Sequence, residues 1–237
     1  MSGTLRWRSS CAAAIACVAV LSGVCQGAEE SAPSMKAGFA ETDITPDLGM
    51  EQPGGYGKSY HRTLHDPCKV RAAVFDDGKK RVALVGVDGI AVHRDMVQAA
   101  RKAIHEKCGI SPEAILIGAS HSHSSGPIFG VRPGEYDDAS PLVQELAYEK
   151  STCVDASYYD HCLKQIIEAV CQADASRAEA RCGVGSGHEN KAAFNRRFRM
   201  KNGLSYTHPR QGNPDIVEPA APIDPGWVSS VLGTRTG

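Results

Sequence analysis

The chain has 237 residues, of which 42% are hydrophobic and 22% are charged, a composition typical of a folded globular protein. Its formal net charge is -1, which gives no basis for binding nucleic acid or an anionic surface. After the first 28 residues, the sequence has no run of the roughly 20 apolar residues that a membrane helix needs. We therefore expect one large domain or two small ones, with no transmembrane segment in the mature chain.

The first 28 residues have the pattern of a secretory signal peptide. Two arginines precede a short apolar run over residues 11–24, and small residues allow cleavage near Gly27 or Ala28. Cys25 raises the alternative of a lipoprotein site, which the bulky residue before it disfavours. We expect the mature protein to be exported to the periplasm or secreted.

Three of the nine cysteines lie in this predicted signal peptide. An oxidising compartment would permit disulfides among the other six, and the sequence does not fix their pairing. No Cys-x-x-Cys spacing typical of zinc or redox sites occurs among them. We expect some disulfides and some buried thiols among these residues: Cys68, Cys108, Cys153, Cys162, Cys171 and Cys182.

The first predicted strand covers about residues 36–41 and is followed by a turn that Asp43 initiates. Residues 52–60 form a glycine-rich loop, whose glycines would let the backbone approach a ligand or would simply make the loop flexible. Residues 68–76 alternate as a strand, and an Asp-Gly turn connects them to a partner strand over residues 81–87. This partner is apolar enough to be buried on both faces.

A strand-helix-strand unit follows. Apolar residues at helical spacing predict a helix over residues 95–108, with Gly109 as its C-terminal cap, and a branched apolar run predicts a strand over residues 115–119. Such a unit has parallel strands and a right-handed connection. Asp88, after the strand over residues 81–87, would then lie close to the residues that follow 119.

After a loop over residues 129–140, the pattern predicts a second helix over residues 157–173 and a strand over residues 177–186. The fold class is therefore α/β, with a mixed sheet that contains a βαβ unit and at least two packed helices. We expect the fold to be incomplete at the C-terminus.

His121 and His123, at the tip of the strand over residues 115–119, are the strongest chemical signal. On an extended segment, side chains two residues apart point the same way, so two neutral imidazoles could share one metal ion. One of them could instead bind the metal while the other orients substrate or water. The alternatives are a hydrogen-bonded histidine pair, or a serine nucleophile among the four serines between residues 120 and 125, which lack the Gly-x-Ser-x-Gly pattern.

Three further residues complete the set of candidates. Asp88 could accept a hydrogen bond from a metal-bound histidine and so orient its ring. Its alternative role is to cap the following turn. Asn195 and Arg196 lie in a loop and could hold a carboxylate or a polar head group, with a solvated basic turn as the alternative.

The ordered motifs resemble those of the neutral ceramidases, the neutral/alkaline non-lysosomal family of zinc amidases. Residues 119–127 (ASHSHSSGP) resemble that family's Thr-His-Thr-His-Ser-Gly-Pro zinc motif, and residues 38–46 resemble its opening strand and Asp-Ile-Thr motif. The strand that ends in Asp88 and the Asn195-Arg196 pair occur in the family's order. The resemblance implies that residues 29–225 are part of an N-terminal catalytic domain.

The resemblance also implies a reaction: zinc-dependent hydrolysis of the N-acyl bond of ceramide, or of a similar N-acyl lipid, to a sphingosine-type amine and a fatty acid. The family holds zinc with two histidines, a glutamate and a tyrosine. His121 matches the first ligand, and His123 matches a histidine close to the metal. The oligomeric state has no signal in the sequence.

Two departures qualify this expectation. A serine is inserted in the histidine motif, at Ser124-Ser125, and the family pattern is lost from Gly226, so residues 226–237 form an off-pattern tail. The family's remaining zinc ligands would lie beyond residue 225. We expect a fragment that lacks several zinc ligands, and the alternative is a non-catalytic exported module that binds metal or lipid.

Overall fold

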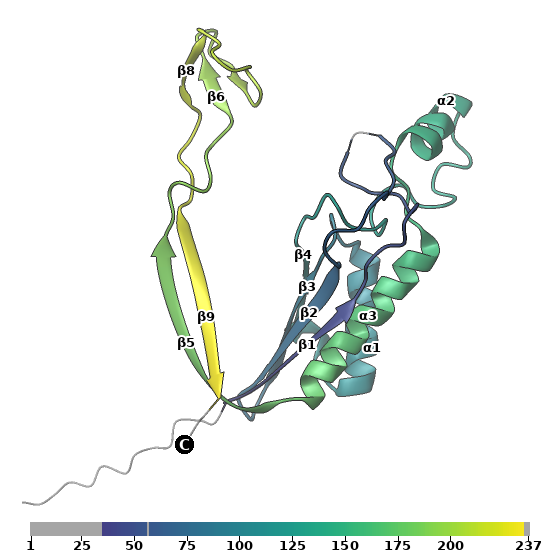
Figure 1. The fold of residues 1–237 in the computed structure, drawn as a ribbon, viewed down its shortest axis with the longest axis vertical. Helices are drawn as coiled ribbons and strands as arrows, with labels where there is room; N and C mark the ends of the chain where they lie inside the picture. Colours follow the sequence, from purple (N-terminus) through teal and green to yellow (C-terminus); the bar gives the residue numbers. More distant parts are fainter. Residues whose placement is uncertain (1–34, 56, 235–237) are drawn as a thin grey trace, which may run out of the picture. The chain divides into compact units, whose positions relative to one another are not determined.

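A six-stranded mixed sheet organises the part of the chain that the computed structural model describes, residues 35–55 and 57–234 (Figure 1). The predicted signal peptide lies outside these residues. The strand order is β4-β3-β2-β1-β5-β9; only β3 and β4 are parallel neighbours among these strands, and the other neighbours are antiparallel. The strands are β1 (Met35–Asp43), β2 (Lys69–Asp76), β3 (Arg81–Val87), β4 (Ile115–Ala119), β5 (Ala178–His188) and β9 (Gly226–Thr234).

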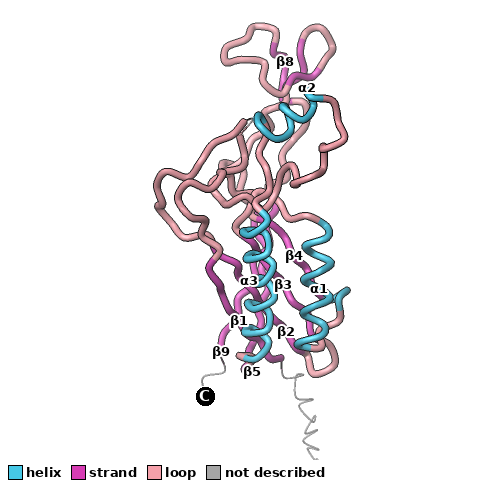
Figure 2. The backbone as a smooth tube through the Cα atoms, turned by 90° about the vertical axis from the view of Figure 1, so that its right-hand side faces the viewer, coloured by secondary structure: helices cyan, strands magenta, loops and turns pink. Residues whose placement is uncertain are grey.

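The two predicted helices are present and pack together on one face of the sheet (Figures 1 and 2). Helix α1 (Arg94–Cys108) connects the parallel strands β3 and β4, which confirms the βαβ unit and the α/β class. Helix α3 (Ala156–Ala175) packs against β1 and β2. Helix α3 buries the whole stripe that its periodicity predicts. Helix α1 buries its predicted stripe except for Val97, which is partly buried. The buried residues are Met96, Ala100 and Ile104 on α1, and Tyr158, Cys162, Ile166, Ala169 and Val170 on α3.

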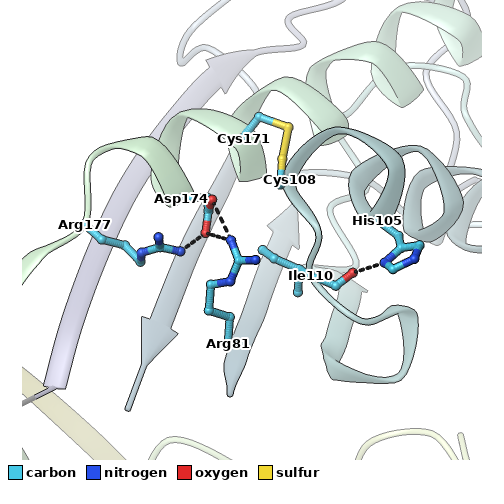
Figure 3. The surroundings of a disulfide bond; sticks show 7 residues. All are labelled: Arg81, His105, Cys108, Ile110, Cys171, Asp174 and Arg177. Carbon is cyan, nitrogen blue, oxygen red and sulfur yellow. Dashed lines mark hydrogen bonds and ion pairs between the residues drawn. A yellow bond between two sulfur atoms is a disulfide. The ribbon is translucent and has the colours of Figure 1, made fainter. Parts of the chain in front are cut away.

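A disulfide joins the two helices at the end where α1 stops (Figure 3). It links Cys108 to Cys171, whose Cα atoms are 6.1 Å apart. Nearby, the Arg81 guanidinium donates to both oxygens of Asp174, at 3.1 and 3.0 Å. Cys68 and Cys162 are buried free thiols, so the expected mixture of disulfides and buried thiols is confirmed.

Several smaller elements lie outside the predicted set. A 3-10 turn (Pro112–Ala114) leads into β4, and α2 (Pro141–Gln144) continues as a π-helical turn (Glu145–Lys150). A separate three-stranded sheet has the order β7-β6-β8, with β6 (Phe198–Met200), β7 (Ser205–Tyr206) and β8 (Ile216–Pro219). The described part of the expected off-pattern tail forms β9, which pairs with β5 from His188↔Gly226 to Ala180↔Thr234.

The expectation that β3 is buried on both faces was wrong. Helices α1 and α3 cover one face, whereas Leu84 on the other face is 42% exposed. The register aligns Phe39, Ala73, Leu84 and Leu116 across β1 to β4, which we call the apolar row. Phe39 is 56% exposed and Leu116 is 61% exposed, so this row has no cover among the described residues.

Helices long and apolar enough to cross a bilayer do not occur within residues 35–55 and 57–234.

Candidate functional site

The carboxyl ends of β3 and β4 lie side by side, as the sequence predicts. Val87 aligns with Ala119 in the parallel register, and the backbone stays paired past the strand ends. The amide of Ser120 donates to the Val87 carbonyl at 2.9 Å, and the amide of Ser122 donates to the Gly89 carbonyl at 3.0 Å. These bonds bring residues 120–125, which we call the histidine turn, to the edge of the sheet where Asp88 lies. In open α/β sheets, ligands bind at this edge.

The histidine turn differs from the extended geometry expected for it. His121 has a φ of 62°, in the left-handed region that non-glycine residues rarely occupy. The chain therefore bends at His121 instead of continuing the strand. The rings of His121 and His123 are nevertheless close, with centroids 5.0 Å apart and a nearly perpendicular arrangement. Both side chains are exposed.

A backbone carbonyl fixes the His121 ring. Its Nδ1 lies 2.8 Å from the carbonyl oxygen of Ile90, which can only accept, so Nδ1 carries the proton. The lone pair is then on Nε2, at the other side of the ring. Metal-binding histidines commonly donate their second ring nitrogen to a carbonyl in this way. His121 could therefore bind a metal ion through Nε2.

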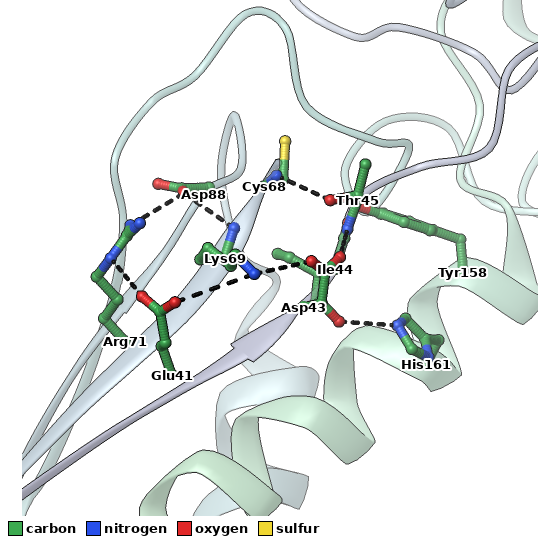
Figure 4. Close-up of polar contacts among 10 residues, drawn as sticks. All are labelled: Glu41, Asp43, Ile44, Thr45, Cys68, Lys69, Arg71, Asp88, Tyr158 and His161. Carbon is green, nitrogen blue, oxygen red and sulfur yellow. Dashed lines mark hydrogen bonds and ion pairs between the residues drawn. The ribbon is translucent and has the colours of Figure 1, made fainter. Parts of the chain in front are cut away.

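Asp88 ties together the strand ends behind the histidine turn (Figure 4). Its carboxylate accepts from the amide of Lys69 at 2.9 Å and from the Arg71 guanidinium at 3.2 Å. It also accepts from the hydroxyl of Ser120 at 3.3 Å, one residue before His121. Asp88 therefore supports the backbone that leads into the turn, whereas the His121 ring donates its hydrogen bond to the carbonyl of Ile90.

The Asp-Ile-Thr motif holds β1 to its neighbours. Asp43 accepts from the amide of Thr45 at 2.8 Å, which confirms the predicted turn, and from Lys69 Nζ at 2.8 Å. The hydrogen bond from Lys69 lowers the pKa of the Asp43 carboxyl to about 2. The Ile44 carbonyl accepts from the hydroxyl of Tyr158 on α3 (Figure 4). The motif is thus structural.

Residues of the histidine turn line two hollows. One, of about 770 Å³, is lined mainly by polar residues, among them Asp88, Ser120 and Ser122. The other, of about 470 Å³, is lined by His123 together with apolar and aromatic side chains such as Ile90 and Phe129. A substrate with a polar and an apolar part would find both kinds of surface along the histidine turn.

Asn195 and Arg196 precede β6, in a different part of the chain. The Asn195 amide donates to the Ala221 carbonyl at 2.8 Å, and its oxygen accepts from the amide of Arg197 at 3.0 Å. Asn195 therefore organises its own loop. None of the hydrogen bonds described for this loop reaches the histidine turn, so the predicted contact with substrate stays a prediction.

The residues present do not complete a zinc site. Catalytic zinc ordinarily has three protein ligands. Within the described ranges, no group of three or more His, Cys, Asp or Glu side chains is placed to hold a metal ion. The histidine turn offers two imidazoles, one fewer than such a site requires.

Sequence reasoning missed the residues that hold the histidine turn. Besides Ile90, these are Gln52, which bonds to the His123 carbonyl at 3.2 Å, and His61, which bonds to the Ser125 carbonyl at 3.0 Å. The glycine-rich composition of residues 52–60 was the one available signal. It marked the loop but not its contact with the histidines.

Comparisons with known proteins bear on the fold. No family model matches the sequence, and no curated protein matches it. Among solved structures, the neutral ceramidase from Pseudomonas aeruginosa is similar with a TM-score of 0.56 at 19% identity, over 84% of this chain and 29% of that chain. A ceramidase complexed with C2 is similar with a TM-score of 0.54 at 19% identity, over 84% of this chain and 28% of that chain. The chain thus has a ceramidase-like fold over most of its length and spans less than a third of the solved ceramidases.

Proposed function

We propose that this chain is part of a ceramidase-like, zinc-dependent amidase that hydrolyses the N-acyl bond of ceramide or of a similar N-acyl lipid. His121 and His123 contribute zinc ligands in this proposal, and Asp88 supports the turn that carries them. Asn195 and Arg196 bind the polar part of the substrate. The observation that carries the proposal is the His121 ring, held by the Ile90 carbonyl with Nε2 free and the His123 ring 5.0 Å away, on a ceramidase-like fold.

The catalytic unit of this proposal includes more polypeptide than residues 35–55 and 57–234. Two imidazoles fall short of the three protein ligands of catalytic zinc, and the similarity covers 29% of the solved ceramidase. The apolar row supports the same view. Exposed side chains of Leu84 and Leu116 lie on a sheet face that would bury them in a complete layered fold.

A layer of polypeptide that covers the apolar row would also reach the histidine turn. A hollow of about 410 Å³ on this face of the sheet is lined by Leu84 and Leu116 at one end and by Asp88 and Ser120 at the other. A covering layer that fills this hollow ends beside the residues that precede His121. The same polypeptide could therefore bury the row and supply the remaining metal ligands.

Export through a signal peptide over residues 1–28 is also part of the proposal. The Cys108–Cys171 disulfide supports it, because such bonds form and persist in oxidising compartments such as the periplasm. N-terminal sequencing of the mature protein would test the cleavage site near Gly27 or Ala28.

A non-catalytic exported module that binds metal or lipid is the second candidate. The same ligand count favours it. Two imidazoles can bind a metal ion, but they do not make up the three protein ligands of the usual catalytic zinc site, which also holds the reacting water.

Metal analysis and an amide-hydrolysis assay separate these two candidates. We expect the purified chain alone to bind zinc weakly and to leave an N-acyl lipid intact. We expect hydrolysis to appear only when a polypeptide that completes the fold is added, and to be lost in His121→Ala. Tight zinc and turnover by the chain alone would contradict the fragment proposal. Metal binding that His121→Ala leaves unchanged would contradict the role of the histidine turn in both candidates.

A further inference from the structure

Residues 51–55 and 57–61, which we call the glycine-rich hairpin, pair with each other next to the histidine turn. Glu51 pairs with Tyr60 as an isolated antiparallel bridge, and the amide of Gln52 donates to the Ser59 carbonyl at 2.8 Å. The amide of His61 donates to the Met50 carbonyl at 2.9 Å. This backbone pairing gives the loop a defined, hydrogen-bonded conformation, in contrast to that of a flexible linker.

Two side chains of the hairpin hold carbonyls of the histidine turn. Gln52 Nε2 donates to the carbonyl oxygen of His123 at 3.2 Å and to the Ser124 hydroxyl at 3.3 Å. His61 Nε2 lies 3.0 Å from the carbonyl oxygen of Ser125 and donates to it. His61 is 8% exposed and Ser125 is fully buried, so this second bond is shielded from water.

Gly54 of the hairpin lies directly against the His123 ring. A Cβ atom built on Gly54 would be 2.7 Å from Cγ of His123 and 2.8 Å from its Nδ1, closer than real Cβ contacts come. Gly54 also has a φ of +110°, which few other residues adopt. The ring therefore occupies the space in which any side chain at position 54 would lie.

We propose that the glycine-rich hairpin sets the position of the His123 imidazole relative to His121, with Gln52, Gly54 and His61 as positioning residues for metal binding by the pair. The Ile90 carbonyl holds the His121 ring through a hydrogen bond. The hairpin holds the backbone of His123 through Gln52 and packs against the His123 ring through Gly54. The metal-binding part of this proposal rests on the proposed function, and the geometric part does not.

The central test compares Gly54→Ala with Gly49→Ala. Gly49 has a φ of +93°, and a Cβ atom built on it would have nothing within 4 Å, so its substitution carries similar backbone strain without a clash. The probe is Cu²⁺ titrated into the full chain against a chromophoric competitor, because imidazoles bind Cu²⁺ well. We expect Gly54→Ala to weaken binding by about tenfold or more, as loss of supporting contacts commonly does. The Cu²⁺ affinity of Gly49→Ala should stay within about twofold of that of the unchanged chain, because this variant loses no supporting contact.

Two further variants separate positioning from general damage. A glutamine at position 61 can donate to the Ser125 carbonyl, so His61→Gln should retain more Cu²⁺ affinity than His61→Ala. The double variant His121→Ala/His123→Ala gives the background from the other histidines. Near-ultraviolet circular dichroism of each variant shows that it is folded. Equal affinities in Gly54→Ala and Gly49→Ala, both well above that of the double variant, would overturn the positioning role.

A metal-free readout distinguishes this proposal from the proposed function. In the apo protein, nuclear Overhauser contacts should join the His123 ring to the Gly54 α-protons and to the His121 ring. The contact between the rings should be lost in Gly54→Ala and kept in Gly49→Ala. If the contacts behave so but Cu²⁺ binds no better than to the double variant, the metal-binding function fails and the positioning holds. Absence of the contacts in the unchanged chain would overturn the positioning itself.

Discussion

Removing the Asp88 carboxylate should destabilise the fold by about 3 kcal/mol, because three donors lose their acceptor at once. The largest loss is the charge-assisted bond from the part-buried Lys69 amide at 2.9 Å, worth about 1.5–3 kcal/mol. The Arg71 pair joins side chains that are 59% and 29% exposed, so it adds no more than about 1 kcal/mol. The Ser120 bond at 3.3 Å is long and adds about 0.5 kcal/mol.

The assay is equilibrium urea unfolding of Asp88→Ala, with Glu41→Ala as the matched control. Glu41 also pairs with Arg71, at 3.4 Å, but its side chain is 55% exposed, and no backbone amide of the described residues donates to it. We expect Glu41→Ala to cost less than about 1 kcal/mol, with the m-value unchanged in both variants. Asp88→Asn, which keeps one acceptor oxygen, should fall between them. If Asp88→Ala costs no more than Glu41→Ala, the carboxylate does not hold the strand ends together.

Three other predictions concern the scaffold around the site. Replacing both cysteines of the Cys108–Cys171 disulfide, 63 residues apart in the chain, should lower the free energy of unfolding by about 4 kcal/mol in urea; an unchanged midpoint would contradict the link. Burial raises the pKa of the Cys162 thiol to about 12, so iodoacetamide at neutral pH should label the exposed Cys182 and spare Cys162 in the folded protein, as peptide mass mapping would show. The Arg132 hydrogen bond lowers the pKa of Asp95 from 3.8 to about 2. The ionised Asp95 therefore stabilises the folded protein fully above pH 4, and this contribution is lost as the pH falls toward 2. Because the Asp95 side chain is 53% exposed, Asp95→Asn should cost only about 0.5 kcal/mol at pH 7 and nothing near pH 2; a gap that widens on acidification would refute this sign.

The elements around the site follow from local periodicity. Strand β3, helix α1 and strand β4 each carry their pattern within a short stretch, and Gly109 ends α1 with a φ of 69°, as a left-handed C-terminal cap requires. Once the βαβ unit is recognised, the shared edge of Asp88 and the histidine turn follows from the parallel pairing. The fold class, and the closeness of the histidine turn to Asp88, could therefore be predicted from the sequence.

Long-range packing decided what the sequence did not predict. β9 has no clear alternation, and it becomes a strand because β5 offers an antiparallel partner along its length. The exposure of Leu84 depends on which sheet face the helices cover, and an apolar strand looks the same in either case. Tertiary context overrides local propensity at such positions.

The two histidines illustrate the same limit at the scale of single atoms. Both lie within six contiguous residues, 120–125, so the motif can be recognised in the sequence. The tautomer of His121 depends on a backbone carbonyl at Ile90, which any residue type would supply, so no pattern could have marked it. The position of His123 depends on Gln52, 71 residues away in the chain, and on the absence of a side chain at Gly54. A motif of this kind therefore identifies the candidate ligands, whereas their geometry is set by neighbours that the motif does not contain. Substitutions at those neighbours should change metal affinity while leaving the motif itself intact.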